Sequence, residues 1–265
     1  MPTHEALQSN HLYHQAWSQF AHASRSGEVI ENQGILAVTA GVAWPATNLA
    51  FLQSPVSSFA ELADRIGVAK RFFADRYPWL FVAFDEWVGP DIDAHAVFAS
   101  QNLRFVQESI GMVADGLSPV ARQLPNLRFH LADDTQTLYE MASINAESYG
   151  MPLALVQEAV ESGPHWASPA MTYIGYMDNE PVATAMTSPI GEVLFVGWVA
   201  TRPARQRRGC AEAIMRHALE QQRAKVGQMR SGLHATPAGL PLYERIGYRP
   251  VARFELYLGG SLPKT

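Results

Sequence analysis

Residues 199–211 read VATRPARQRRGCA, and their pattern is the most informative in the chain. The unbroken apolar run at 193–200 that leads into it is typical of a buried strand. A helical pattern starts directly after the glycine, and its apolar side chains share one face: Ala211, Ile214, Met215, Ala218 and Leu219. The order of strand, basic glycine turn and helix predicts an anion site, because the first N–H groups of a helix have no intrahelical acceptor.

Gly209 stands at the centre of this turn. Because it has no side chain, it lets an anion approach the backbone closely. The alternative is a solvated basic turn, which many helix starts carry without a ligand. Acidic residues are normally preferred at a helix start, so a cluster of arginines there indicates a phosphate site; these are Arg202, Arg205, Arg207 and Arg208.

Two motifs in this chain resemble those of the GCN5-related N-acetyltransferases. The turn matches the family's Gln/Arg-x-x-Gly-x-Gly/Ala signature, here Gln206-Arg207-Arg208-Gly209-Cys210-Ala211. Residues 241–250 read PLYERIGYRP and resemble the family's closing Leu-Tyr-x-x-x-Gly-Phe/Tyr helix and turn. Either motif alone is a weak signal, but both occur in the family's order with a helix and a strand between them. The resemblance covers roughly residues 127–258.

The resemblance implies an α/β fold with a mixed sheet, that of the acyl-CoA N-acyltransferases, and acetyl-CoA as acyl donor. In that fold the N–H groups of residues 207–212 surround the pyrophosphate. A bulge in the preceding strand leaves the Val199 N–H facing the acetyl carbonyl, while Ala200 and Thr201 pair with the pantetheine amides. Tyr243 is the general acid that protonates the leaving thiolate. The implied cofactor site comprises Val199, Ala200, Thr201, Gln206, Arg207, Arg208, Gly209, Cys210, Ala211 and Glu212.

The pattern after residue 127 predicts the elements of such a fold. A capping aspartate within 133–136, with Gln136 as its partner, indicates a helix start. Residues 178–180 are typical of a hairpin turn, and residues 162–169 are typical of a loop. Gly227 is typical of a helix end. Strands are expected at 127–131, 171–177, 181–187, 193–200, 231–235 and 248–258, and further helices at 152–161, after Gly209 and at 237–246.

The N-terminal half reads as a separate unit. We expect an N-terminal α/β domain at 1–118, a linker at 119–126 and the catalytic domain at 127–265. Patterning predicts a strand at 34–41, a helix at 59–76 and a strand at 79–88. Residues 98–106 also align with 243–251, with Phe98 under Tyr243. The first half is therefore either a degenerate copy of the same fold, without the glycine turn, or an unrelated α+β domain.

The general base is poorly determined by the sequence. Glu192 begins the strand that leads to the glycine turn, and Glu147, Asp178 and His234 are alternatives. Each of them fits a structural or solvent-facing role as well. Water can carry the proton in many enzymes of this type, so an obvious base is not required.

Two further residue types invite a functional interpretation. Cys210 occupies the variable position of the turn and reads as a small apolar filler, although a helix start can lower a thiol pKa. Trp166 and Trp198 are core residues by default, or else line an acceptor pocket.

Composition limits the remaining classes of protein. The chain has 265 residues, a formal net charge of −5 and one cysteine. The acidic balance argues against a nucleic-acid binder, and no apolar run approaches the roughly 20 residues of a membrane span. A signal-peptide pattern is missing at the start and the histidines show no metal-ligand spacing, so we expect a cytoplasmic protein without a metal site.

The function expected from these observations is acetyl-CoA-dependent transfer of an acetyl group directly to a primary amine. The acceptor, a small molecule or a peptide amine, is not readable from the sequence. One alternative is a catalytically silent coenzyme A sensor or scaffold, and another is an acyltransferase that uses a larger acyl-CoA. We expect a monomer or a homodimer that binds neither nucleic acid nor membrane.

Overall fold

The computed structural model describes residues 2–74, 76–164, 166, 169–227 and 229–261. Within them, hydrogen-bonded strands follow the order β1-β2-β3-β4-β11-β5-β10-β9-β8-β7-β6, a mixed sheet as expected. Parts of the expected loop at 162–169, namely residues 165, 167 and 168, lie outside the described residues. None of the described helices has the length and apolarity needed to cross a membrane.

The chain forms two compact units, and neither is continuous in sequence. The first comprises residues 1–111, 234–238 and 250–265, and the second comprises 112–233 and 239–249. The expected linker at 119–126 lies within the second unit. The difference arises because strand pairing groups residues that are distant in the chain: 254–259 of β11 pair antiparallel with 79–84 of β4.

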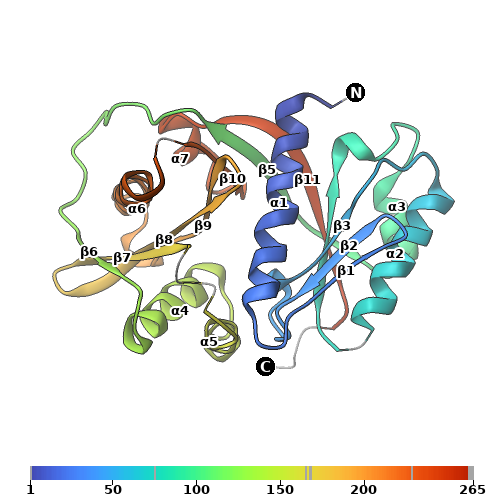
Figure 1. Ribbon diagram of the computed structural model, residues 1–265, viewed down its shortest axis with the longest axis horizontal. Helices are drawn as coiled ribbons and strands as arrows, with labels where there is room; N and C mark the ends of the chain where they lie inside the picture. Colours follow the sequence, from blue (N-terminus) through green and yellow to red (C-terminus); the bar gives the residue numbers. More distant parts are fainter. Residues whose placement is uncertain (1, 75, 165, 167–168, 228, 262–265) are drawn as a thin grey trace. The chain divides into compact units, whose positions relative to one another are not determined.

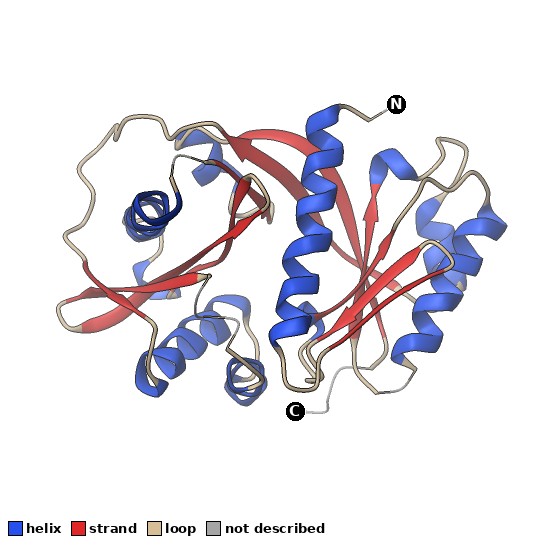
Figure 2. Ribbon diagram, in the orientation of Figure 1, coloured by secondary structure: helices blue, strands red, loops and turns tan. Residues whose placement is uncertain are grey.

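The second unit has the elements that the sequence predicts after residue 127. Helices α4 and α5 lie on one face of strands β6 to β9, and α6 lies on the other face (Figure 1). The elements are β6 (Arg128–Leu131), α4 (Thr135–Tyr149), α5 (Leu153–Glu161), β7 (Met171–Met177), β8 (Glu180–Ile190), β9 (Val193–Thr201), α6 (Cys210–Val226), β10 (Arg230–Ala235) and α7 (Leu240–Arg245). Residues 115–127 form a loop without regular structure (Figure 2).

Local chemistry explains where these elements begin and end. Asp134 caps α4 by accepting the Thr137 N–H at 2.8 Å, and the Thr137 hydroxyl is the reciprocal partner. The expected partner, Gln136, was therefore wrong, because it donates to Glu140 instead. The residues at 178 and 179 both have positive φ, as the tight turn between β7 and β8 requires. Gly227 ends α6 as expected.

The first half of the chain repeats the element order of the second half. The helix–strand succession from α1 to β5 matches that from α4 to β11, except that α5 has no counterpart, so the interpretation as a degenerate second copy is confirmed. The elements of the first unit are α1 (His4–Ala23), β1 (Glu28–Asn32), β2 (Ile35–Thr39), β3 (Asn48–Leu52), α2 (Phe59–Phe73), β4 (Trp79–Phe84), α3 (Ala94–Ser100) and most of β5 (Arg104–Ala114) and of β11 (Arg249–Gly259). Helix α1 lies on one face of its strands, and α2 and α3 lie on the other (Figure 1).

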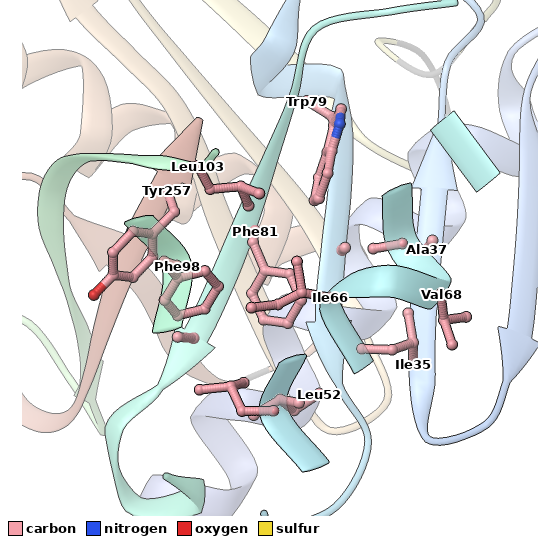
Figure 3. Packing of buried hydrophobic residues seen from close by; sticks show 14 of the residues in the cluster. Ile35, Ala37, Leu52, Ile66, Val68, Trp79, Phe81, Phe98, Leu103 and Tyr257 are labelled. Atoms are coloured by element: carbon pink, nitrogen blue, oxygen red, sulfur yellow. The ribbon is translucent and has the colours of Figure 1, made fainter. Parts of the chain in front are cut away.

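Phe98 replaces, in α3, the tyrosine that α7 carries at residue 243. Its side chain is fully buried. The ring stacks on Tyr257 with centroids 3.7 Å apart and lies edge-on to Phe81 at 5.0 Å (Figure 3). This position therefore serves the hydrophobic core of the first unit.

Replacing Phe98 by alanine should destabilise the protein strongly. Removal of a fully buried aromatic ring leaves a cavity, so Phe98→Ala should lower the free energy of unfolding by about 4 kcal/mol. Urea denaturation followed by circular dichroism measures this. The matched control is Phe59→Ala, because Phe59 is 51 % exposed and its loss should change stability by less than about 0.5 kcal/mol. Equal effects of the two substitutions would contradict this packing.

Candidate active site

Strands β9 and β10 separate beyond the middle of β9. They pair in parallel at three positions only, Val193 with Arg230, Leu194 with Ser231 and Phe195 with Gly232. On its other edge β9 stays paired with β8 as far as Thr201. In the described parts of the two strands, residues 196–201 of β9 therefore have an edge that β10 does not cover.

A bulge lies at this open part of β9. Its register with β8 shifts between Thr184 and Met186, and Trp198 has a φ of +54°. A side chain in that left-handed region costs about 1–2 kcal/mol, so neighbouring groups must stabilise it. The bulge that the resemblance implied is thus present.

Side chains from α4 and β8 hold this bulge. The Thr184 hydroxyl donates to the Trp198 carbonyl at 2.8 Å. Buried Asn145 in turn donates to Thr184 at 3.2 Å. The Trp166 ring packs edge-on against Trp198 at 4.9 Å, and its N–H donates to the Val160 carbonyl. Trp166 is therefore buried support for the bulge, whereas Trp198 is only half-buried.

The bulge decides which backbone groups face the open edge. The Arg202 N–H donates to Val182 of β8 at 2.9 Å, and backbone groups alternate between the two edges of a strand. Ala200, which lies opposite Thr184, therefore faces β8 as well. Val199 and Thr201 face the other edge, where pairing with β10 has ended.

The turn after β9 presents backbone N–H groups at the start of α6. Arg207 and Gly209 have positive φ, +59° and +89°. The Ala213 N–H donates to the carbonyl of Gly209, the N-cap residue of α6, at 3.0 Å. The N–H groups of residues 207–212 precede it and so lack intrahelical acceptors, which is the geometry of an anion site.

The arginines of the turn have two different roles. Arg202 donates to the Pro181 carbonyl and the Ser143 hydroxyl and pairs with Glu147. Arg205 forms an ion pair with Glu180 at 2.6 Å. The expectation that all four arginines attract a ligand was therefore wrong for these two, because carboxylates already neutralise them.

Arg207 and Arg208 remain as exposed cations. Among the described residues, neither forms an ion pair. The loop before β6 brings a third cation that sequence reasoning missed: the Arg122 guanidinium lies 3.5 Å from where a Cβ on Gly209 would stand. Pro125 lies 3.1 Å from the same point, so no side chain fits at Gly209 without a shift.

Cys210 is buried, 1 % exposed, at the first position of α6. Burial raises the pKa of its thiol despite the nearby Arg205 and Arg208 guanidinium groups. The suggestion that the helix start lowers this pKa was wrong, because desolvation outweighs it. The interpretation as a small buried side chain is confirmed.

Tyr243 is buried on α7, and its ring lies 6.1 Å from that of Tyr248. Burial is the main cause that raises its pKa far above the ordinary value, and interactions with Tyr149 and Tyr248 raise the pKa further. Within the described chain its hydroxyl has no hydrogen-bond partner. Burial therefore keeps the phenol in its protonated form.

Glu212 fastens α6 to the helix that carries Tyr243. Its side chain is almost fully buried, lies 2.9 Å from Arg216 and lies 3.6 Å from Arg245 of α7. Arg245 is two residues beyond Tyr243, so this carboxylate helps to set the position of α7. No local sequence pattern signals this role, because Arg245 is distant in the chain.

None of the expected bases is a free carboxylate or imidazole at the open edge. Glu192 is exposed at the opposite end of β9, roughly 20 Å along the strand from Val199. Glu147 is paired with Arg202, and Asp178 lies in the β7–β8 turn. His234 is buried against Tyr13, and burial lowers its pKa to about 3. Among the described residues no cluster of His, Cys, Asp and Glu could hold a metal.

The corresponding turn of the first unit, between β3 and α2, is closed by its own side chains. The Ser58 hydroxyl accepts the Glu61 N–H at 3.1 Å, and the Glu61 carboxylate accepts the Ser57 N–H at 3.0 Å. This capping lowers the pKa of Glu61, with the Ser57 N–H as the main cause. A carboxylate thus covers the helix start where the second unit has free N–H groups.

Comparison with known proteins agrees with this geometry. Residues 168–250 match the family model of the acetyltransferase (GNAT) domain. This segment contains both motifs that carry the resemblance, which is thereby confirmed. A search of curated proteins found no match.

Solved structures share the fold over nearly the whole chain. A GCN5-related N-acetyltransferase from Kribbella flavida is 17 % identical with a TM-score of 0.67, and the match covers 97 % of this chain and 96 % of that one. A conserved protein of unknown function from Staphylococcus epidermidis is 12 % identical (TM-score 0.65, 91 % and 97 % covered). A GCN5-related N-acetyltransferase from Sphaerobacter thermophilus is 13 % identical (TM-score 0.58, 88 % and 82 % covered). The likeness is one of fold, and with the matched domain model it supports an acyl-transfer function.

Loss of the Glu212 carboxylate should destabilise the second unit. Glu212→Ala leaves two arginines without their buried partner and should lower the free energy of unfolding by about 2 kcal/mol. Urea denaturation measures the change. The matched control is Glu220→Ala on the same helix, where the side chain is exposed and the effect should be below about 0.5 kcal/mol. Unchanged stability of Glu212→Ala would show that the carboxylate does not fasten α7.

Proposed function

We propose that this protein is an acetyl-CoA-dependent N-acetyltransferase that moves an acetyl group directly to a primary amine. One observation carries the proposal: the uncovered edge of β9 leads directly into a helix start with free N–H groups and unpaired arginines. The uncovered edge of β9 can form hydrogen bonds with an extended ligand, and the helix start can bind phosphates. Coenzyme A has both an extended arm with amide groups and phosphates.

The phosphate end of the cofactor would bind at the start of α6. The N–H groups of residues 207–212 are the donors for the pyrophosphate. Arg207, Arg208 and Arg122 add positive charge close by, and no described carboxylate neutralises them. Gly209 leaves the space that the phosphates need.

The thioester would lie along the open edge of β9. The acceptor amine attacks the acetyl carbon, so a C–N bond forms and the C–S bond breaks. The Val199 N–H donates to the carbonyl oxygen as negative charge develops there, a contribution of about 3 kcal/mol in comparable sites. The Tyr243 O–H transfers its proton to the thiolate, water takes the proton of the amine, and a proton from this water restores the phenol.

The acceptor would enter beside Trp198, whose ring is half-buried. We propose an amine on a small molecule or a peptide as its chemical class. The Trp166 ring supports Trp198 from behind, so the two tryptophans contribute to this pocket in different ways.

Replacing Gly209 by glutamate should abolish cofactor binding. The new side chain would meet Pro125 and place a carboxylate where the phosphates bind. Calorimetric titration with acetyl-CoA should give micromolar affinity for the wild type and at least a 100-fold loss in Gly209→Glu, about 3 kcal/mol. The matched control is Gly116→Glu, since a Cβ there meets nothing within 4 Å. Equal affinity of Gly209→Glu and wild type would refute the phosphate site.

Replacing Tyr243 by phenylalanine should slow transfer without weakening acetyl-CoA binding. Loss of a general acid lowers turnover by about 100-fold, and the ring keeps its packing. Thiol release with a panel of amines measures turnover, and calorimetry measures binding. Tyr139→Phe is the control, because the Tyr139 hydroxyl donates to Glu161 on α5. Turnover of Tyr243→Phe at the wild-type rate would exclude Tyr243 as the acid.

A further inference from the structure

The end of α4 is bound to the two carbonyls that β9 presents on its open edge. The Ser148 hydroxyl donates to the Thr201 carbonyl at 2.9 Å. The next residue, Tyr149, donates its hydroxyl to the Val199 carbonyl at 3.3 Å. Side chains of this chain thus already occupy acceptors that an extended ligand along β9 would use.

The Thr201 and Val199 carbonyls differ in the number and length of the hydrogen bonds that they accept. The Thr201 carbonyl accepts a second hydrogen bond, from the Gln206 side-chain amide at 3.2 Å. The Val199 carbonyl has the phenol alone among the described side chains, at the longer distance. Tyr149 is also 46 % exposed, so its ring has room to swing toward solvent. The bond at Val199 is therefore the one that a ligand can displace.

Tyr149 also lies close to the proposed acid. Burial of its hydroxyl raises the pKa of Tyr149 to about 12, so the phenol keeps its proton and can donate. The interaction between the two phenols is one of the causes, after burial, that raise the pKa of Tyr243. Tyr149 is thus joined to Val199 by a hydrogen bond and to Tyr243 by an electrostatic interaction.

We propose that Tyr149 is a positioning residue whose hydroxyl holds the place of a substrate N–H on the Val199 carbonyl and leaves when the acyl donor binds. This inference rests on the proposed function. The occupant is an amide of the pantetheine arm, because a carbonyl accepts only from N–H or O–H donors and the arm carries two amides. The phosphate end of the donor is bound elsewhere and does not compete with Tyr149.

The test compares two ligands on three proteins by calorimetric titration. The ligands are acetyl-CoA and adenosine 3′-phosphate 5′-diphosphate, which has the phosphates but lacks the pantetheine arm. The proteins are the wild type, Tyr149→Phe and Tyr139→Phe. The last is a matched control, since it removes a tyrosine hydroxyl from the same helix at a distant bond with Glu161.

Tyr149→Phe should bind acetyl-CoA about fivefold more tightly than the wild type, the factor that corresponds to one competing hydrogen bond. Its affinity for the truncated ligand should stay unchanged, and Tyr139→Phe should match the wild type with both ligands. Weaker or unchanged binding of acetyl-CoA to Tyr149→Phe, with normal binding by the wild type, overturns the role of Tyr149 alone. A parallel gain with the truncated ligand overturns it as well. Failure of the wild type to bind acetyl-CoA overturns the proposed function and this role together.

Discussion

The bulge at Trp198 is the constraint on which the candidate site depends. It lies just beyond Phe195, the last residue of β9 that pairs with β10, in a stretch that remains paired with β8. A regular strand would continue its pairing and bury every backbone group in the sheet. The strained φ of Trp198 persists because the Thr184 hydroxyl donates to its carbonyl and is itself held by a hydrogen bond from Asn145. As a result, Val199 and Thr201 present backbone groups that no neighbouring strand pairs with.

Ion pairs within the second unit position the turn after β9 and helix α7 beside the uncovered edge of β9. Carboxylates neutralise Arg202 and Arg205 in ion pairs that fix the turn. The cations that can bind a ligand are therefore Arg207, Arg208 and Arg122. Glu212 ties α6 to α7 in the same way. Charges in this unit therefore divide into a buried or paired set that shapes the site and an exposed set that can bind phosphate.

Much of this could be predicted from local sequence. The glycine turn, the closing tyrosine motif and most elements after residue 127 follow patterns of short range, and the structure has them. Other features depend on distant residues, such as the links from Tyr149 to Val199 and from Asn145 to Thr184, which no local pattern shows. Helix α1 was not predicted from the sequence. It buries polar Ser9 and Asn10 beside its apolar residues, so its amphipathic pattern is weak.

The most direct test of this account is the number of acetyl-CoA molecules that one chain binds. The second unit has a helix start with free N–H groups, whereas in the first unit Ser57, Ser58 and Glu61 close the corresponding turn. Calorimetric titration of the purified protein should therefore give one site per chain. Two sites per chain, or none, would contradict the account.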